Sequence, residues 1–105
     1  MLYLVIAKDG ADSEAPARRQ AVRPEHLENV TPAVESGFVL LGGALLNKEG
    51  GMTGSAMLLE AASEEEVWAF LKRDVYFTGN VWQQFEVYPF KKAVQSLALT
   101  QVAVS

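Results

Sequence analysis

The first strand expected in this chain is apolar on both faces, which restricts the folds open to it. In Leu2–Ala7 every residue is apolar, in both phases of the strand alternation. A strand of this kind must be covered on both sides. Phe38–Leu46 has the same character around the glycine pair Gly42 and Gly43. The sheet that these strands build therefore needs material on both of its faces.

Strand and helix patterns alternate along the chain in one order. Strands are expected over Leu2–Ala7, Phe38–Leu46, Gly54–Ala61 and Val81–Phe90, and helices over Ala17–Ser36 and from Ser63 to near Arg73. The order β-α-β-β-α-β predicts an α+β, ferredoxin-like fold, with a four-stranded antiparallel sheet and both helices on one face. Two helices leave the other face uncovered. We therefore expect a second copy of the sheet to cover it, giving a homodimer.

The first helix is expected to be interrupted. Its apolar stripe is formed by residues spaced by three and four, Leu27, Val30 and Val34. Pro24 suits the first turn of a helical segment, and Pro32 should kink or split the helix because it removes a backbone donor. Gly37 then provides a left-handed terminator.

The second helix has a clear start. Ser63 followed by Glu66 has the spacing of a capping box, in an acidic first turn that suits the helix dipole. Asp74–Asn80 is expected as a loop. Gly42 and Gly43, inside a strand, indicate a bulge or a place where a ligand approaches the backbone.

Composition limits the classes of function. The 105 residues fit one domain, over residues 1–92, with a tail over 93–105 that forms a short helix or strand, or packs on a partner subunit. Without cysteine there are no disulfides or thiolate metal sites, which suits the cytoplasm. No apolar run reaches the roughly 18 residues of a membrane span. The net charge of −4 argues against binding nucleic acid.

His26 is the only histidine, and it is the natural candidate for proton transfer near neutral pH. It lies about 40° from Val30 on the helical wheel, so it is expected to be half-buried at the edge of the stripe. A packing or surface histidine is the alternative. Asp74 lies past the end of the second helix, where the dipole disfavours a negative charge. Either Arg73 or His26 could compensate; with His26 the pair is an acid–base dyad.

Four further residues are candidates for substrate binding, each with an alternative. Arg23 could hold a carboxylate or phenolate with two bonds, or be an exposed charge. Ser55 could bond a substrate oxygen, although it lacks the motif of a nucleophilic serine. Gly43 could let a ligand approach, or form a bulge. Tyr76 could wall an aromatic pocket, or belong to the core. Neither a metal-ligand spacing nor a phosphate or dinucleotide motif is present, so no metal or cofactor is expected.

Several segments, in this order, resemble the YciI-like family of small α+β proteins, the YCII-related domain. They are Met1–Ala7, Arg23–Leu27, Leu41–Leu45, Gly54–Ser55, Asp74–Phe77 and Gly79–Val81. The resemblance implies a fold of the dimeric α+β barrel type and a His–Asp active site, here His26 and Asp74. Members usually have proline directly after the aspartate, where this chain has Val75.

The resemblance implies an enzyme of lyase or isomerase type. It would act without a cofactor on a small cyclic or aromatic molecule, because proteins of this fold include lactone isomerases and a dehydrochlorinase. A non-catalytic module that binds a small ligand, or serves as an accessory dimer, is the alternative. A purely structural dimer is the third.

Overall fold

The computed structural model describes residues 1–101 of the chain, with side chains described up to residue 99. Its elements are β1 (Leu2–Asp9), α1 (Ala15–Glu35), β2 (Val39–Leu46), β3 (Met52–Glu60), α2 (Glu64–Arg73), α3 (Val75–Thr78), β4 (Trp82–Phe90) and the 3₁₀ helix η1 (Leu97–Gln101). The predicted β-α-β-β-α-β order is confirmed, with α3 and η1 added. The last residues of the predicted tail, 102–105, lie outside the described residues.

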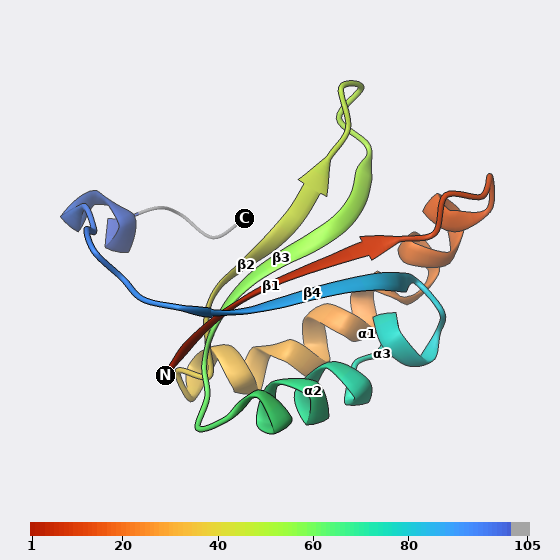
Figure 1. Ribbon diagram of the computed structural model, residues 1–105. Coiled ribbons are helices and arrows are strands. Elements are labelled where there is room, and N and C mark those ends of the chain that lie inside the picture. Colours follow the sequence, from red (N-terminus) through yellow and green to blue (C-terminus); the bar gives the residue numbers. More distant parts are fainter. Residues whose placement is uncertain (102–105) are drawn as a thin grey trace.

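The four strands form one antiparallel sheet in the order β2-β3-β1-β4. β1, the strand with the most uniformly apolar sequence, is therefore central and pairs on both edges. The helices α1, α2 and α3 all lie on the same face of the sheet (Figure 1). This is the ferredoxin-like arrangement that the order of segments predicts. No helix of the described chain is long and apolar enough to cross a membrane.

The two faces of β1 have different surroundings. Tyr3, Val5 and Ala7 point toward the helices and are buried in the core with residues of β3 and α2. Leu2, Leu4 and Ile6 point to the other face, which we call the open face, and are only partly buried. Large apolar side chains of the neighbouring strands share this face and are exposed, namely Leu41, Tyr88 and Phe90. The apolar side chains of the open face therefore still require the cover that the sequence predicts.

The expectation that the prolines divide the first helix is wrong. α1 runs unbroken from Ala15 to Glu35 with Pro24 and Pro32 in its interior, and the proline in its first turn is Pro16. Both interior prolines are exposed, as are Gln20 and Glu28, whose carbonyl groups lose their helical donors. Water can bond those carbonyls, so the helix continues.

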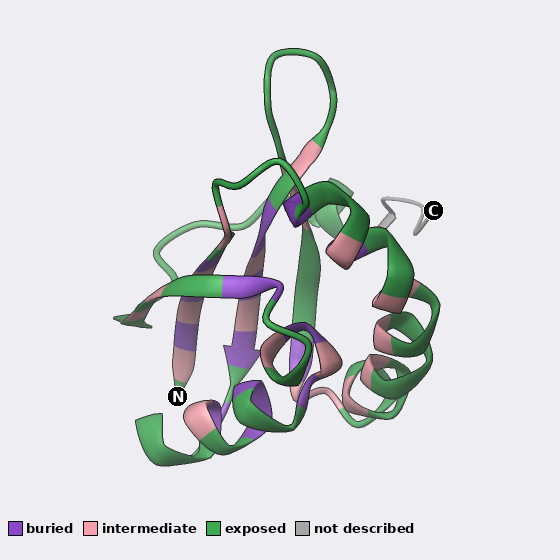
Figure 2. Cartoon of the chain, turned by 90° about the vertical axis from the view of Figure 1, so that its right-hand side faces the viewer, coloured by how far each residue is buried: buried purple, intermediate pink, exposed green. Residues whose placement is uncertain are grey.

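The expected apolar stripe of α1 is wrong for Leu27 and Val34, whereas Val30 packs against the core as expected. Leu27 is 44% exposed and Val34 51%, and most of the helix surface is exposed (Figure 2). The side that faces the sheet is instead made of Ala15, Arg19, Val22, His26, Val30 and Ala33. Two of these six side chains are polar, so the inner face of α1 carries functional groups as well as core contacts.

Three local expectations are met and two are not. Ser63 accepts a hydrogen bond from the Glu66 amide at 3.2 Å, as a helix cap does. Gly37 has a left-handed φ of 83°, and α2 ends at Arg73. The expected bulge at the paired glycines is absent, because the shifts of register fall at either end of β2. The expected loop after Asp74 contains the short helix α3.

Removing the cap of α2 should destabilise the protein. Ser63→Ala is expected to lower the free energy of unfolding by about 1 kcal/mol, because the Glu66 amide loses its acceptor. Urea unfolding measures the loss. Ser13→Ala, at an exposed residue before α1, is the matched control and should change stability by less than about 0.5 kcal/mol. Equal effects of the two substitutions would contradict the capping role.

Candidate functional site

His26 and Asp74 meet between α1 and the junction of α2 with α3. The imidazole Nδ1 lies 2.8 Å from Oδ1 and 2.9 Å from Oδ2 of the carboxylate. The side chains are 14% and 5% exposed, so the pair is largely shielded from water. Because an ionised carboxylate only accepts hydrogen bonds, Nδ1 carries the hydrogen. In the neutral ring Nε2 is then left as the basic nitrogen.

Asp74 is held by two helices at once. Its amide donates to the Leu71 carbonyl at the end of α2, and its Oδ1 accepts from the Tyr76 amide at 2.8 Å at the start of α3. The negative charge that is unfavourable at the end of α2 therefore suits the beginning of α3. The side-chain partner of Asp74 is His26, and no bond joins Asp74 to Arg73.

The imidazole ring of His26 is enclosed by aromatic side chains. It stacks on the Tyr76 ring, with centroids 3.9 Å apart and planes 14° from parallel. Trp82 meets it edge-on at 6.0 Å. Tyr76 is 1% exposed. Burial raises the pKa of its hydroxyl, against the opposing charges of Arg19 and Arg23. These contacts fix the plane of the imidazole, as a proton-transfer group needs.

The buried side chain of Arg19 contacts the Tyr76 ring of this stack. One terminal nitrogen of Arg19 bonds the Asp9 carboxylate at 2.9 and 3.1 Å, and the other donates to Ser55 Oγ at 2.9 Å. The indole of Trp82 donates to the same hydroxyl at 3.1 Å. The guanidinium carbon lies 4.6 Å from the centre of the Tyr76 ring, in a cation–π contact. Arg19 thus links β1, β3 and the aromatic residues around the imidazole.

The Asp9–Arg19 pair is a true interior ion pair, with both side chains 4% exposed. Burial raises the pKa of Asp9, and the Arg19 guanidinium opposes that rise. Removing two charges from water is expensive. Hydrophobic periodicity alone gives no reason to expect a buried arginine at this position. Its position seven residues before His26, on the same side of α1, was the available signal.

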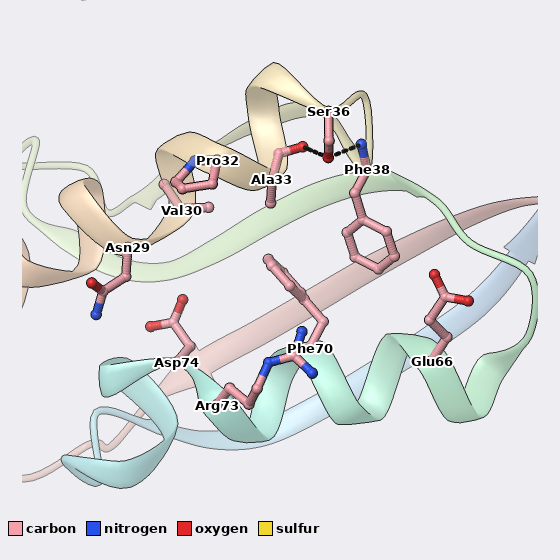
Figure 3. Close-up of a pocket in the computed structure, with 10 residues that line it drawn as sticks. All are labelled: Asn29, Val30, Pro32, Ala33, Ser36, Phe38, Glu66, Phe70, Arg73 and Asp74. Carbon is pink, nitrogen blue, oxygen red and sulfur yellow. Dashed lines mark hydrogen bonds between the residues drawn. The ribbon is translucent and has the colours of Figure 1, made fainter.

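A groove lies between α1 and α2 beside the pair. It encloses about 580 Å³ and has Asp74 among its lining residues, whereas His26 does not line it (Figure 3). Its middle is apolar, with the rings of Phe38 and Phe70 4.9 Å apart. The pair is therefore approached from the groove only through its carboxylate.

The family model for the YCII-related domain matches residues 1–91. The chain belongs to this family. Fusaric acid biosynthesis protein 2 of Gibberella fujikuroi is 32% identical over 97 residues, which cover 85% of this chain and 91% of that protein. An aspartate kinase of Fusarium oxysporum is 32% identical over 99 residues, which cover 87% of this chain. The chain spans only 18% of the length of that kinase.

A solved structure also resembles this YCII-related domain. It is the 5-chloro-2-hydroxyhydroquinone dehydrochlorinase of Burkholderia phenoliruptrix in complex with 2,5-dihydroxybenzoquinone. The TM-score is 0.76 at 26% identity, and the match covers 89% of this chain and 96% of the other. The predicted fold class, ferredoxin-like of the dimeric α+β barrel type, is confirmed.

The predicted site residues of the YCII-related domain fall into two groups. His26, Asp74, Tyr76 and Ser55 lie together on the helix face of the sheet, joined by the contacts above. Gly43 lies on the open face, paired with Ala56, away from this cluster. Among the described residues, no atom lies within 4 Å of where a Cβ on Gly43 would be, so no described side chain covers the face there.

Arg23 and Ser55 occupy different depths in the site. Arg23 is half-buried on α1, one turn before His26, and has no ion-pair partner among the described residues. Ser55 is buried, and its oxygen already accepts from both Arg19 and Trp82. The substrate-binding roles of Arg23, Gly43, Ser55 and Tyr76 stay predictions.

Removing the buried guanidinium should cost far more than removing an exposed one. Arg19→Met is expected to lower the free energy of unfolding by about 3–5 kcal/mol, because Asp9 is left buried and unpaired. The folded-state pKa of Asp9 then rises further above its unfolded value. The protonated form is favoured in the fold, so the loss should shrink as the pH falls and grow as it rises.

The control for this prediction is Arg18→Met, which removes a solvent-exposed pair with Asp12 and should have a small effect. Denaturant unfolding of both variants at acidic and neutral pH makes the comparison. A loss for Arg19→Met that matches the control, or that does not change with pH, would show that the interior pair is unimportant for stability.

Proposed function

We propose that this protein is a cofactor-independent acid–base enzyme of lyase or isomerase type, acting on a small cyclic or aromatic molecule. The observation that carries the proposal is the bond between His26 Nδ1 and the Asp74 carboxylate, inside a cage of aromatic rings. Asp74 fixes the tautomer, so that Nε2 takes a proton from the substrate and later returns it. The imidazolium formed in between is stabilised by the carboxylate.

The substrate class is supported by the relatives. The similar solved enzyme is named as a dehydrochlorinase of a chlorinated hydroxyhydroquinone and was solved with a dihydroxybenzoquinone. Hydroxylated rings become oxyanions when a base removes their protons. In our proposal Arg23, one turn from His26 and free of an ion pair to any described residue, binds that oxyanion. Arg19, behind Tyr76, is a positioning residue for the stack.

Substitution of the two dyad residues tests this proposal. His26→Gln is expected to lower turnover by about 10²–10⁴-fold, and Asp74→Asn should also release the ring from its Nδ1–H tautomer. Chloride release from 5-chloro-2-hydroxyhydroquinone gives the rate, and the ¹⁵N resonances of the imidazole give the tautomer. Glu25→Gln, at an exposed neighbour on α1, is the control. Full turnover by His26→Gln would remove the imidazole from the chemistry.

A non-catalytic binding or accessory module is the second candidate. It is favoured by the similarity to one part of a much longer aspartate kinase, in which a domain of this kind accompanies another activity. Binding of the chlorinated hydroquinone by the wild-type protein without release of chloride would support this alternative.

We further propose that the protein forms a homodimer through the open face, and that the tail of each chain packs on the partner subunit. We also propose that the protein is located in the cytoplasm. The open face carries exposed apolar residues, among them Leu41 at 53% and Tyr88 at 47%. Val94 in the tail is 90% exposed. A monomer seldom leaves so many large apolar side chains in water.

The dimer is tested by sedimentation at micromolar concentration. The wild-type protein should sediment at twice the chain mass. Leu41→Lys should shift it toward the monomer, because a charge would be buried at the interface. Leu27→Lys, at a similarly exposed leucine on the outer side of α1, should leave the mass unchanged. A monomeric wild-type protein would contradict the proposal.

A further inference from the structure

The groove between α1 and α2 has the size and lining of a ligand site. Its volume of about 580 Å³ lies within the range of about 300–1,000 Å³ typical of small-molecule pockets. The apolar middle is built from Val30 and Ala33 of α1 with Phe38 and Phe70. Figure 3 shows the two phenyl rings between the helices, with the Asp74 carboxylate toward one end and the Glu66 carboxylate toward the other. A flat ring would find aromatic partners there.

The charged side chains that line the groove differ between its two ends. Arg73, beside Asp74, forms no ion pair with any described residue. Glu66, two turns earlier on α2, already accepts a hydrogen bond from the Ala62 amide. Asp74 is also near Arg73, but its carboxylate already accepts bonds from His26 and the Tyr76 amide. An anionic group is therefore attracted to the Arg73 guanidinium and repelled from Glu66. A free guanidinium can bind a carboxylate through two parallel bonds, whose planar geometry suits the acid group of a flat aromatic ring.

The Asp74 carboxylate, which lines this end of the groove, has one hydrogen-bond acceptor position that no described residue uses. Its Oδ1 accepts from the Tyr76 amide and also contacts His26, whereas Oδ2 contacts His26 alone. A carboxylate offers about four acceptor positions. The side chain is 5% exposed and lines the groove, so a ligand hydroxyl there is the natural donor for the free position.

We propose that this groove is a second ligand site, for a hydroxylated aromatic acid, that acts on the dyad through Asp74. The ring lies against Phe38 and Phe70, the acid group bonds Arg73, and the hydroxyl donates to Asp74. Because His26 does not line the groove, this ligand does not reach the reacting nitrogen. It modulates the pair because a second donor on the carboxylate draws electron density from it and weakens its bond to Nδ1–H. This goes beyond the acid–base function proposed above and stands or fails separately from it.

The experiment is an NMR titration of the full chain with the three isomers of hydroxybenzoate. At least one isomer should shift the amide resonances of Ala33, Phe70 and Arg73, and with them the imidazole ¹⁵N resonances of His26. Benzoate, which lacks the hydroxyl, should shift the groove amides and leave the imidazole resonances in place. Shifts confined to the open face, or none at millimolar ligand, would overturn the proposal.

Two variants locate the site. Arg73→Gln is expected to weaken binding by about tenfold, because the charge-assisted bonds to the acid group are lost. Lys72→Gln, at an exposed neighbour outside the groove, should bind as the wild type does. Ala33→Leu fills the groove and should abolish the shifts while the spectrum stays dispersed. Wild-type affinity in either Arg73→Gln or Ala33→Leu would exclude this groove. Neither result bears on turnover at His26.

Discussion

The Asp74 carboxylate is the point where the separate parts of this structure meet. Its amide closes the end of α2, its Oδ1 begins α3, and both oxygens hold the ring of His26 on α1. Each of these bonds satisfies a group that would otherwise be buried without a partner. The helices on the sheet are therefore tied together at one residue, through its backbone amide and its charged side chain. Any chemistry performed by the imidazole depends on a residue that also shapes the fold.

The inner side of α1 explains how a small domain can hold a polar site in its core. Arg19 and His26 lie two turns apart, and the Tyr76 ring contacts them both. An aromatic ring can stack on an imidazole and also accept a guanidinium near its face, so the Tyr76 ring can pack against both groups. The two terminal nitrogens of the guanidinium donate to Asp9 and Ser55. Its Nε has no hydrogen bond to a described residue. The part of the core that lies between the sheet and α1 thus contains a network of buried polar side chains.

Much of this arrangement follows from the sequence, and the exceptions have physical causes. The order of strands and helices could be predicted because strand and helix periodicities differ and because Ser63 marks a helix start. The pairing of His26 with Asp74 could be predicted as one of two alternatives, from a charge left at a helix end. The inner side of α1 could not, because hydrophobic periodicity selects leucine and valine. Leu27 and Val34 are exposed, while Arg19 is buried through partners 10 and 36 residues away in the chain. Long-range polar contacts of this kind leave no periodic signal.

The family match and the geometry constrain the chemistry at different levels. Membership of the YCII-related family explains the fold, and it is shared by relatives whose names refer to different activities. The same fold can host different reactions, so the reaction has to be argued from the residues. The two ring nitrogens of His26 have different surroundings, and this difference bears on the chemistry. One is occupied by Asp74, and the other is positioned by Tyr76 and Trp82. A ring held in this way favours one protonation geometry before any ligand arrives, and such preorganisation is what the proposed acid–base role requires.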